Sequence, residues 1–133
     1  MLNILKDAID LGIVTGNSAA MVSFYRDLLG LKEEGIIPMP GGGTMHRLKA
    51  GDSIIKIVET DPAPPEEAIP GGIRAATGYR YWTITVGNLE QCLEVLRGKD
   101  VPIPVGPKTV RPGVTIAMVV DPDGNWLELI QYD

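Results

Sequence analysis

The chain of 133 residues repeats one pattern twice, and this repeat constrains its fold more than any other feature. Residues 11–31 and residues 82–101 each contain a short β-forming run, then the dipeptide Gly-Asn, then an amphipathic helical stretch with one arginine. The strand segments 55–57 and 127–129 form a further matched pair, offset by 72 residues. Two copies of a strand–helix–strands unit therefore fill the chain, and we expect equivalent positions of the two copies to face each other across a cleft.

Apolar periodicity and turn residues predict the order β-α-β-β-β in each repeat, with mainly antiparallel neighbours and an α+β class. In the first repeat we expect strands at 11–15, 32–37, 44–49 and 53–59, and a helix of about 3.6-residue periodicity that Gly30 ends. In the second we expect strands at 79–86, 101–105, 114–120 and 126–131, and a helix at 89–96. The predicted organisation is a single domain over 1–133, with module one at about 1–60, a Pro/Gly-rich linker at about 60–77 and module two at about 78–133.

Composition excludes several classes of function. The net charge of −5 argues against nucleic acid as a partner, because phosphate binding needs a basic face. No apolar run approaches twenty residues, so neither a membrane span nor a membrane partner is expected, and residues 1–10 lack the apolar stretch of a signal peptide. With Cys92 as the single cysteine, no intrachain disulfide can form, and we expect a cytoplasmic protein with this thiol packed in the core.

Two motifs resemble the vicinal oxygen chelate superfamily, the group of glyoxalase I, extradiol dioxygenases and the fosfomycin- and bleomycin-resistance proteins. They are the helix end FYRDLLGL at 24–31 and the turn and last strand DPDGNWLEL at 121–129. Together with the repeat, the resemblance covers essentially the whole chain. It implies two βαβββ modules that form a curved mixed sheet around a central cleft, in a protein that often forms homodimers. One fold hosts many reactions, so the resemblance specifies the fold and leaves the reaction open.

In the metal-using members of this superfamily, the resemblance implies ligands at the start of the opening strand and the middle of the closing strand of each module. These positions are Asp10 and Lys56 in the first module, and Tyr81 and Glu128 in the second. Strand alternation places Lys56 and Glu128 on the cleft side, together with Trp126 of the last strand.

This chain departs from the superfamily's ligand set, which combines histidine or glutamine with glutamate. Glu128 is a good ligand and Asp10 a possible one, but a protonated lysine has no free lone pair. We therefore expect no cofactor, and a divalent metal held by Glu128 and Asp10 alone, Mg²⁺ or Mn²⁺, stays the alternative. Lys56 is interpreted as replacing the metal cation in an ion-paired triad with Asp10 and Glu128, which either holds the modules together or binds a polar ligand.

Other residues are candidates for ligand contact, each with a plain structural alternative. Trp126 and Tyr79 could form an apolar stacking wall, with Thr83 lining the same cleft. His46 is the only histidine and has the side chain best suited to proton transfer near neutral pH, although a lone strand histidine is more often structural. Arg47 could clamp a carboxylate or phosphate, or be simply exposed.

The leading hypothesis is a protein that binds a small organic molecule in the inter-module cleft without a catalytic metal, for sequestration or resistance. An aromatic or conjugated compound with a cationic or hydroxyl group is expected to fit best. One alternative is an enzyme, a glyoxalase I-like lyase, an isomerase or an extradiol dioxygenase-like oxidoreductase, with Glu128, Tyr81 and Asp10 as catalytic groups. Another is a dimerising accessory module. In each case a homodimer is expected, because modules of this size bury little surface alone.

Overall fold

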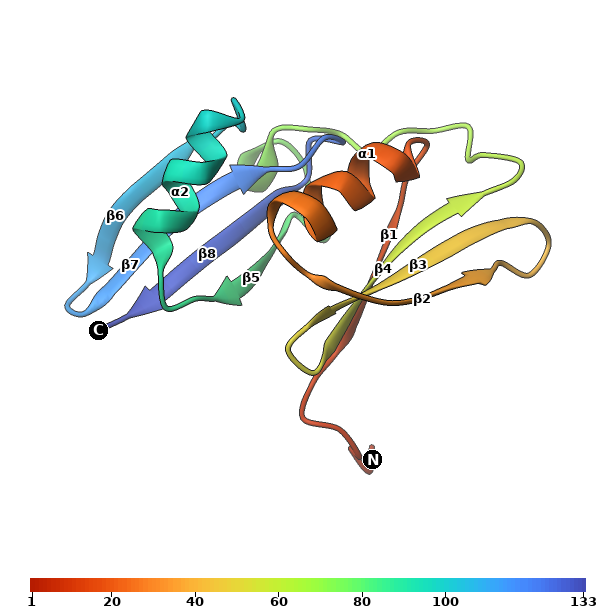
Figure 1. Cartoon of the computed structure of the whole chain (residues 1–133), viewed down its shortest axis with the longest axis horizontal. Helices are drawn as coiled ribbons and strands as arrows, with labels where there is room; N and C mark the ends of the chain where they lie inside the picture. The colour runs from red at the N-terminus through yellow and green to blue at the C-terminus, as the bar shows by residue number, and fades with distance from the viewer. The chain divides into compact units, whose positions relative to one another are not determined.

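The computed structural model describes all 133 residues, which form two compact units, Met1–Glu67 and Ala68–Asp133 (Figure 1). Each unit contains one four-stranded mixed sheet and a helical segment that packs on it. The fold class is α+β, as the repeat predicts. None of the helices is long and apolar enough to cross a lipid bilayer.

The two units share one topology. The first has sheet order β1-β4-β3-β2, and the second has the matching order β5-β8-β7-β6. In both, the opening strand runs parallel to the closing strand and the other neighbours are antiparallel. The elements of the first unit are β1 (Asp10–Val14), α1 (Ser18–Val22), the π-helix η1 (Ser23–Leu28), β2 (Lys32–Pro38), β3 (Gly43–Ala50) and β4 (Ser53–Thr60). Those of the second are the 3₁₀ helix η2 (Gly72–Arg74), β5 (Tyr81–Thr85), α2 (Leu89–Gly98), β6 (Val105–Arg111), β7 (Val114–Val120) and β8 (Trp126–Tyr132).

Each closing strand directs successive side chains to opposite faces of its sheet, although Ile54, Val58 and Ile130, on the faces of Lys56 and Glu128, are buried as well. Ile57 in β4 is fully buried and Leu129 in β8 is 3% exposed, and both face the helix of their own unit. Lys56, which precedes Ile57, and Glu128, which precedes Leu129, are only half-buried and point to the opposite face of their sheet. We call the opposite face the open face of each sheet. The alternation predicted from the sequence is thus confirmed within both units.

The last part of each closing strand also holds the start of the helix. The Glu59 carboxylate accepts hydrogen bonds from the Ser18 amide at 3.2 Å and the Ser18 hydroxyl at 3.1 Å. In the second unit the Gln131 side-chain oxygen accepts from the Leu89 amide at 2.7 Å. Helix-start amides lack partners within the helix, so a strand side chain that supplies one fixes the helix on its sheet. The repeat thus extends to a contact that the sequence comparison did not reveal.

The first helix is present as predicted, but it is a regular α-helix for only part of its length, contrary to the 3.6-residue periodicity of the sequence. α1 has only five residues and passes directly into η1, whose wider turns are seen in the hydrogen bond of 2.9 Å from the Leu29 amide to the Phe24 carbonyl. The change accompanies the burial of two consecutive aromatic residues, Phe24 and Tyr25, whose rings meet edge to face with centroids 4.9 Å apart. A 3.6-residue periodicity alone does not predict this arrangement.

The prediction of a strand at 101–105 is also wrong. The corresponding strand, β6, begins only at Val105. Pro102 and Pro104 have no amide hydrogen to donate to a neighbouring strand, so the segment before Val105 cannot form a regular ladder. It is held instead by a bond of 3.1 Å from the Val120 amide to the Pro102 carbonyl.

Candidate functional site

In the first unit, Asp10 and Lys56 lie together on the open face of the sheet. The Lys56 ammonium is 3.7 Å from one Asp10 carboxylate oxygen, while Lys6 donates to the other oxygen at 2.8 Å. The hydrogen bond from Lys6 holds the pKa of Asp10 below its usual value, and the charges of Lys6 and Lys56 act in the same direction. Two of the four positions selected from the sequence are therefore occupied by an ion pair.

The same face carries Arg47, whereas His46 lies on the other face. Arg47 is directly opposite Lys56 in the β3–β4 register, and opposite residues of an antiparallel pair share a face. Its guanidinium lies 3.5 Å from a Glu34 carboxylate oxygen. His46 is opposite the buried Ile57, and its Nδ1 is buried without a hydrogen-bond partner. The structure therefore brings Arg47 to Asp10 and Lys56, and it separates His46 from them.

In the second unit, four of the candidate residues share the open face in two adjacent pairs. Tyr81 is beside Trp126 in the register of β5 and β8, and Thr83 is beside Glu128. The Thr83 hydroxyl donates a hydrogen bond of 2.9 Å to the Glu128 carboxylate and so orients it. Tyr79 lies ahead of β5 and is fully exposed. Tyr81, Thr83, Trp126 and Glu128 thus form one continuous surface.

Strands β6, β7 and β8 add mainly apolar side chains to this face, together with Lys108, which is opposite Ile116. Val114, Ile116 and Ile130 form a buried cluster, with Val105 packed against it. Met118, which is 2% exposed, lies directly opposite Glu128. A carboxylate beside an apolar wall is a common composition for a small-molecule site.

Trp126 is partly covered by a segment that the sequence suggested was only a linker. A side-chain carbon added to Gly72 would lie 2.2 Å from the indole ring of Trp126, so the backbone of Gly72 is in direct contact with the ring. Arg80 holds this segment by donating to the carbonyls of Gly72 at 2.8 Å and Ile69 at 2.7 Å. We call residues 69–74 the strap. Sequence reasoning missed it, although the adjacent glycines in the Pro-rich segment were a signal for close backbone approach.

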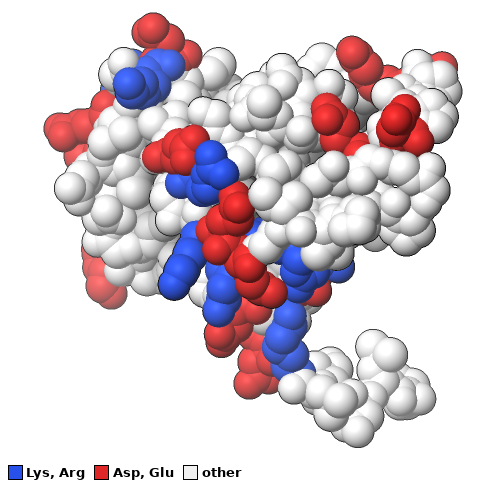
Figure 2. All heavy atoms as spheres, turned by 45° about the vertical axis from the view of Figure 1, so that its right-hand side comes forward, with Lys and Arg blue, Asp and Glu red and all other residues white.

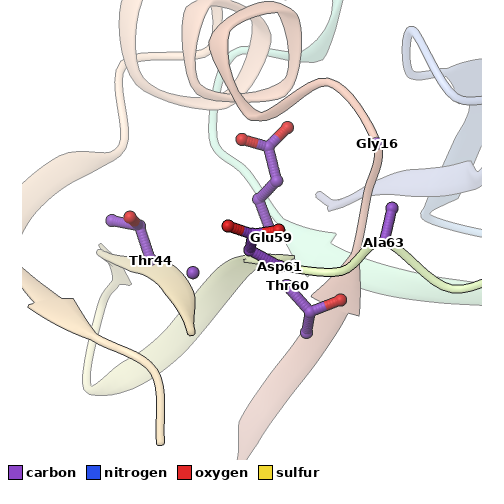
Figure 3. A pocket seen from close by; sticks show the side chains of 7 residues that line it. Gly16, Thr44, Glu59, Thr60, Asp61 and Ala63 are labelled. Carbon is purple, nitrogen blue, oxygen red and sulfur yellow. The ribbon is translucent and has the colours of Figure 1, made fainter. Parts of the chain in front are cut away.

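A separate pocket of about 540 Å³ lies within the first unit, near the start of α1 (Figure 3). Its lining is polar and acidic, and it consists of Gly16, Gly43, Thr44, Glu59, Thr60, Asp61 and Ala63. Glu59 rises from β4 into this pocket, where it is already bonded to Ser18. The sequence analysis did not select any of these residues, because Glu59 carries no motif and its partner lies 41 residues away.

The residues at the candidate metal positions do not suit a divalent cation. Both oxygens of Asp10 face ammonium groups, and Lys56 would repel a cation beside it. Within each unit, no group of three or more histidine, cysteine, aspartate or glutamate side chains gathers to hold a metal ion. Glu128 is left as the one carboxylate oxygen donor among the candidates of the second unit, beside the phenol of Tyr81.

Cys92 and the DPDG turn have structural surroundings. The Cys92 thiol is only partly buried and is not part of the core, contrary to the prediction; it lies 3.3 Å from the Asn88 side-chain oxygen, and burial raises its pKa, which favours the protonated form. The buried Asp121 carboxylate accepts from the amides of Asp123 and Asn125 at 3.0 and 2.9 Å, so it closes the turn.

A model of the glyoxalase/bleomycin resistance protein/dioxygenase superfamily matches residues 8–129. The chain belongs to this superfamily. The resemblance of the helix-end and last-strand motifs is thereby confirmed. A search of curated proteins finds no match.

Several solved structures share the fold. A glyoxalase family protein from Bacillus cereus matches with a TM-score of 0.82 at 16% identity, covering 99% of this chain and 98% of that one. TnmS3, an antibiotic binding protein from Streptomyces sp. CB03234, has a TM-score of 0.74 at 19% identity and full coverage of both chains. The trypanothione-dependent glyoxalase I of Leishmania major has a TM-score of 0.73 at 22% identity, covering 92% of this chain and 84% of that one.

Proposed function

We propose that this superfamily member binds a small organic molecule without a catalytic metal and acts by sequestration, in the manner of a resistance protein. The observation that carries the proposal is the open face of the second sheet, where an oriented carboxylate lies beside an aromatic ring and an apolar cluster. Lys56 supports the metal-free part, because its ammonium lies at a position where metal-using members hold a ligand. The shared fold with an antibiotic binding protein agrees with this role.

The proposed ligand is an aromatic or conjugated compound that carries a cationic or hydroxyl group. Trp126 and Tyr81 offer ring surface, and Glu128 offers a charged acceptor that Thr83 already aligns. Because the strap covers part of Trp126, the ligand is expected to contact the uncovered part of the ring or to displace the strap. Tyr79, fully exposed, contributes only if it turns towards this face.

A screen of such compounds by tryptophan fluorescence tests the proposal. Trp126 is on the open face, whereas Trp82 is on the helix-facing side, so binding should change the emission of Trp126 and leave that of Trp82 nearly constant. Trp126→Phe and Trp82→Phe variants separate the two signals. Elemental analysis of protein purified without chelator accompanies the screen. A stoichiometric Zn, Ni, Fe or Mn content would overturn the proposal. So would compounds whose affinity stays the same in both Trp126→Ala and Glu128→Gln.

The second candidate is an enzyme of the lyase, isomerase or dioxygenase type, with Glu128 as a base. It is favoured by the pairing of Glu128 with Thr83, which aims the carboxylate, and by the nearby Tyr81 hydroxyl. Asp10 is less suited to proton transfer, because its lowered pKa keeps it ionised and bound to Lys6. Turnover of a bound compound that disappears in Glu128→Gln would select this function.

We further propose a cytoplasmic homodimer, on the grounds of the single cysteine and of an apolar N-terminal segment. Met1, Leu2, Ile4 and Leu5 are all more than 70% exposed, in a segment that extends away from β1 (Figure 1). Apolar side chains gathered in this way favour association with another protein surface. Light scattering at micromolar concentration should give a dimer mass, and removal of residues 1–5 should lower it. A monomer mass for the full chain at every concentration would contradict the dimer.

A further inference from the structure

The open face of the first sheet concentrates positive charge in an acidic protein. Its strands carry four cations, Lys32, Arg47, Lys49 and Lys56. Two carboxylates reach this face, those of Asp10 and Glu34. Lys6, just before β1, is paired to Asp10 and adds a fifth cation, so the face holds three positive charges in excess while the whole chain has a net charge of −5. Figure 2 shows most of its blue side chains gathered in the lower centre of the view and interleaved with red ones, with a further blue group apart at the upper left.

The cations are arranged as neighbours, which a sheet normally avoids. Lys32 is directly opposite Lys49, and Arg47 is directly opposite Lys56. Like charges at opposite positions destabilise an antiparallel pair. The side chains of Arg47 and Lys56 are only 26% and 30% exposed, so water screens their repulsion incompletely. Their carboxylate partners lie on the outer sides at 3.5 and 3.7 Å and leave the region between the two cations without a negative group.

Space is available at this cation pair. In the register of the four strands, Gly12 is the neighbour of Lys56 and Gly35 is the neighbour of Arg47. A side-chain carbon added at either glycine would meet no atom within 4 Å. Two cations thus stand in a row between two positions that have no side chain.

We propose that this row is a binding site for a small anion, a carboxylate or phosphate group that bridges Arg47 and Lys56. A planar guanidinium and an ammonium side by side suit two oxygens of such a group. The site is small and flanked by Asp10 and Glu34, which would repel the continuous phosphate backbone of a nucleic acid. The inference goes beyond the function proposed above, since it concerns the other sheet and a ligand of opposite charge.

A titration with inorganic phosphate, followed by amide chemical shifts at constant ionic strength, tests the site. We expect saturable shifts at Arg47 and Lys56 in β3 and β4, and no comparable response to sodium chloride. Arg47→Gln and Lys56→Gln should each raise the dissociation constant about tenfold, as expected for loss of one charge-assisted contact. Lys108→Gln, on β6 of the other unit, is the matched control and should leave the affinity unchanged.

A second variant keeps the test independent of charge. Gly12 has ordinary backbone angles, so Gly12→Val is tolerated by the strand but fills the space beside Lys56. It should weaken phosphate binding while the protein stays folded. A parallel titration with acetate shows whether a carboxylate suffices.

Two results would overturn the site. One is a chemical-shift change that grows linearly with both phosphate and acetate; the other is an affinity that stays the same in Arg47→Gln, Lys56→Gln and Gly12→Val. Tighter binding of a short oligonucleotide through the same residues would overturn the small-anion assignment. The readout is confined to the first sheet, so it fails or succeeds independently of the Trp126 fluorescence screen.

Discussion

The two sheets have the same topology, but their open faces carry side chains of different chemistry. On the side that packs against the helix, both closing strands bury aliphatic residues, Ile57 in one and Leu129 in the other. On the open side the first sheet carries Lys56 and Arg47, and the second carries Glu128 beside an apolar cluster. The core requirement is the same for both copies of the repeat, so the helix-facing side stays alike, while the open sides are free to acquire different chemistry.

In the second unit the strap covers part of the open face at Trp126, and disturbing this contact should cause the largest loss of stability. Gly72→Ala places a side chain against Trp126 at a backbone φ of +69°. Overpacking and the left-handed conformation together should cost roughly 2–5 kcal/mol of unfolding free energy. Chemical denaturation measures this loss.

Gly78→Ala is the matched control for the strap. Gly78 also has a positive φ, of +101°, but no atom lies within 4 Å of an added side-chain carbon. It should therefore show only the backbone cost, about 1–2 kcal/mol. Equal losses for the two variants would mean that the strap does not press on Trp126, and the contrast between a second face covered by its own segment and a first face without such a segment would fail.

An intermediate effect is expected from the two strand-to-helix contacts. Glu59→Ala removes the acceptor of both the Ser18 amide and hydroxyl, whereas Gln131→Ala removes the acceptor of the Leu89 amide alone. Each loss should be about 0.5–2 kcal/mol, as for other helix-start acceptors. The loss should be larger for Glu59, because an ionised acceptor bonds more strongly than a neutral amide. Thermal or urea unfolding of the two variants makes the comparison, and a larger loss for Gln131→Ala would reverse it.

The sequence predicted the features that depend on local pattern. Strand alternation placed Lys56 and Glu128 on the face opposite Ile57 and Leu129, and the repeat predicted the shared topology. Contacts between distant segments were not accessible in this way. The strap depends on Gly72 meeting Trp126, 54 positions later in the chain, and the local pattern only marks Gly72 as part of a loop. The parity of Arg47 and His46 needed the β3–β4 register, which a hairpin sequence leaves uncertain by one residue.

The smallest effect should come from the ion pairs of Asp10, and it separates the roles of the two lysines. The folded-state pKa of Asp10 is lowered, first through the hydrogen bond from Lys6 and then through the charges of Lys6 and Lys56. A lowered carboxylate pKa contributes stability that is present above the unfolded pKa of about 4 and is lost as the pH falls through the folded value. Lys6→Met should therefore decrease the stability at pH 7 and flatten its dependence below pH 4. Lys56→Met should do so less, because its ammonium is 3.7 Å from the carboxylate and that of Lys6 is 2.8 Å away.

The pH profile of unfolding for both variants and for Asp10→Asn measures this difference. With the side chains of Asp10 and Lys56 both about one third exposed, solvent screens the pair, and Lys56→Met should stay close to the parent in stability. That outcome fits a lysine placed on the open face to meet a ligand, whereas a large loss at pH 7 that is relieved in acid would mean that Lys56 mainly neutralises buried carboxylate. In that case the first face would be a structural counterpart of the second, and the division between an anion-binding face and an organic-ligand face would no longer hold.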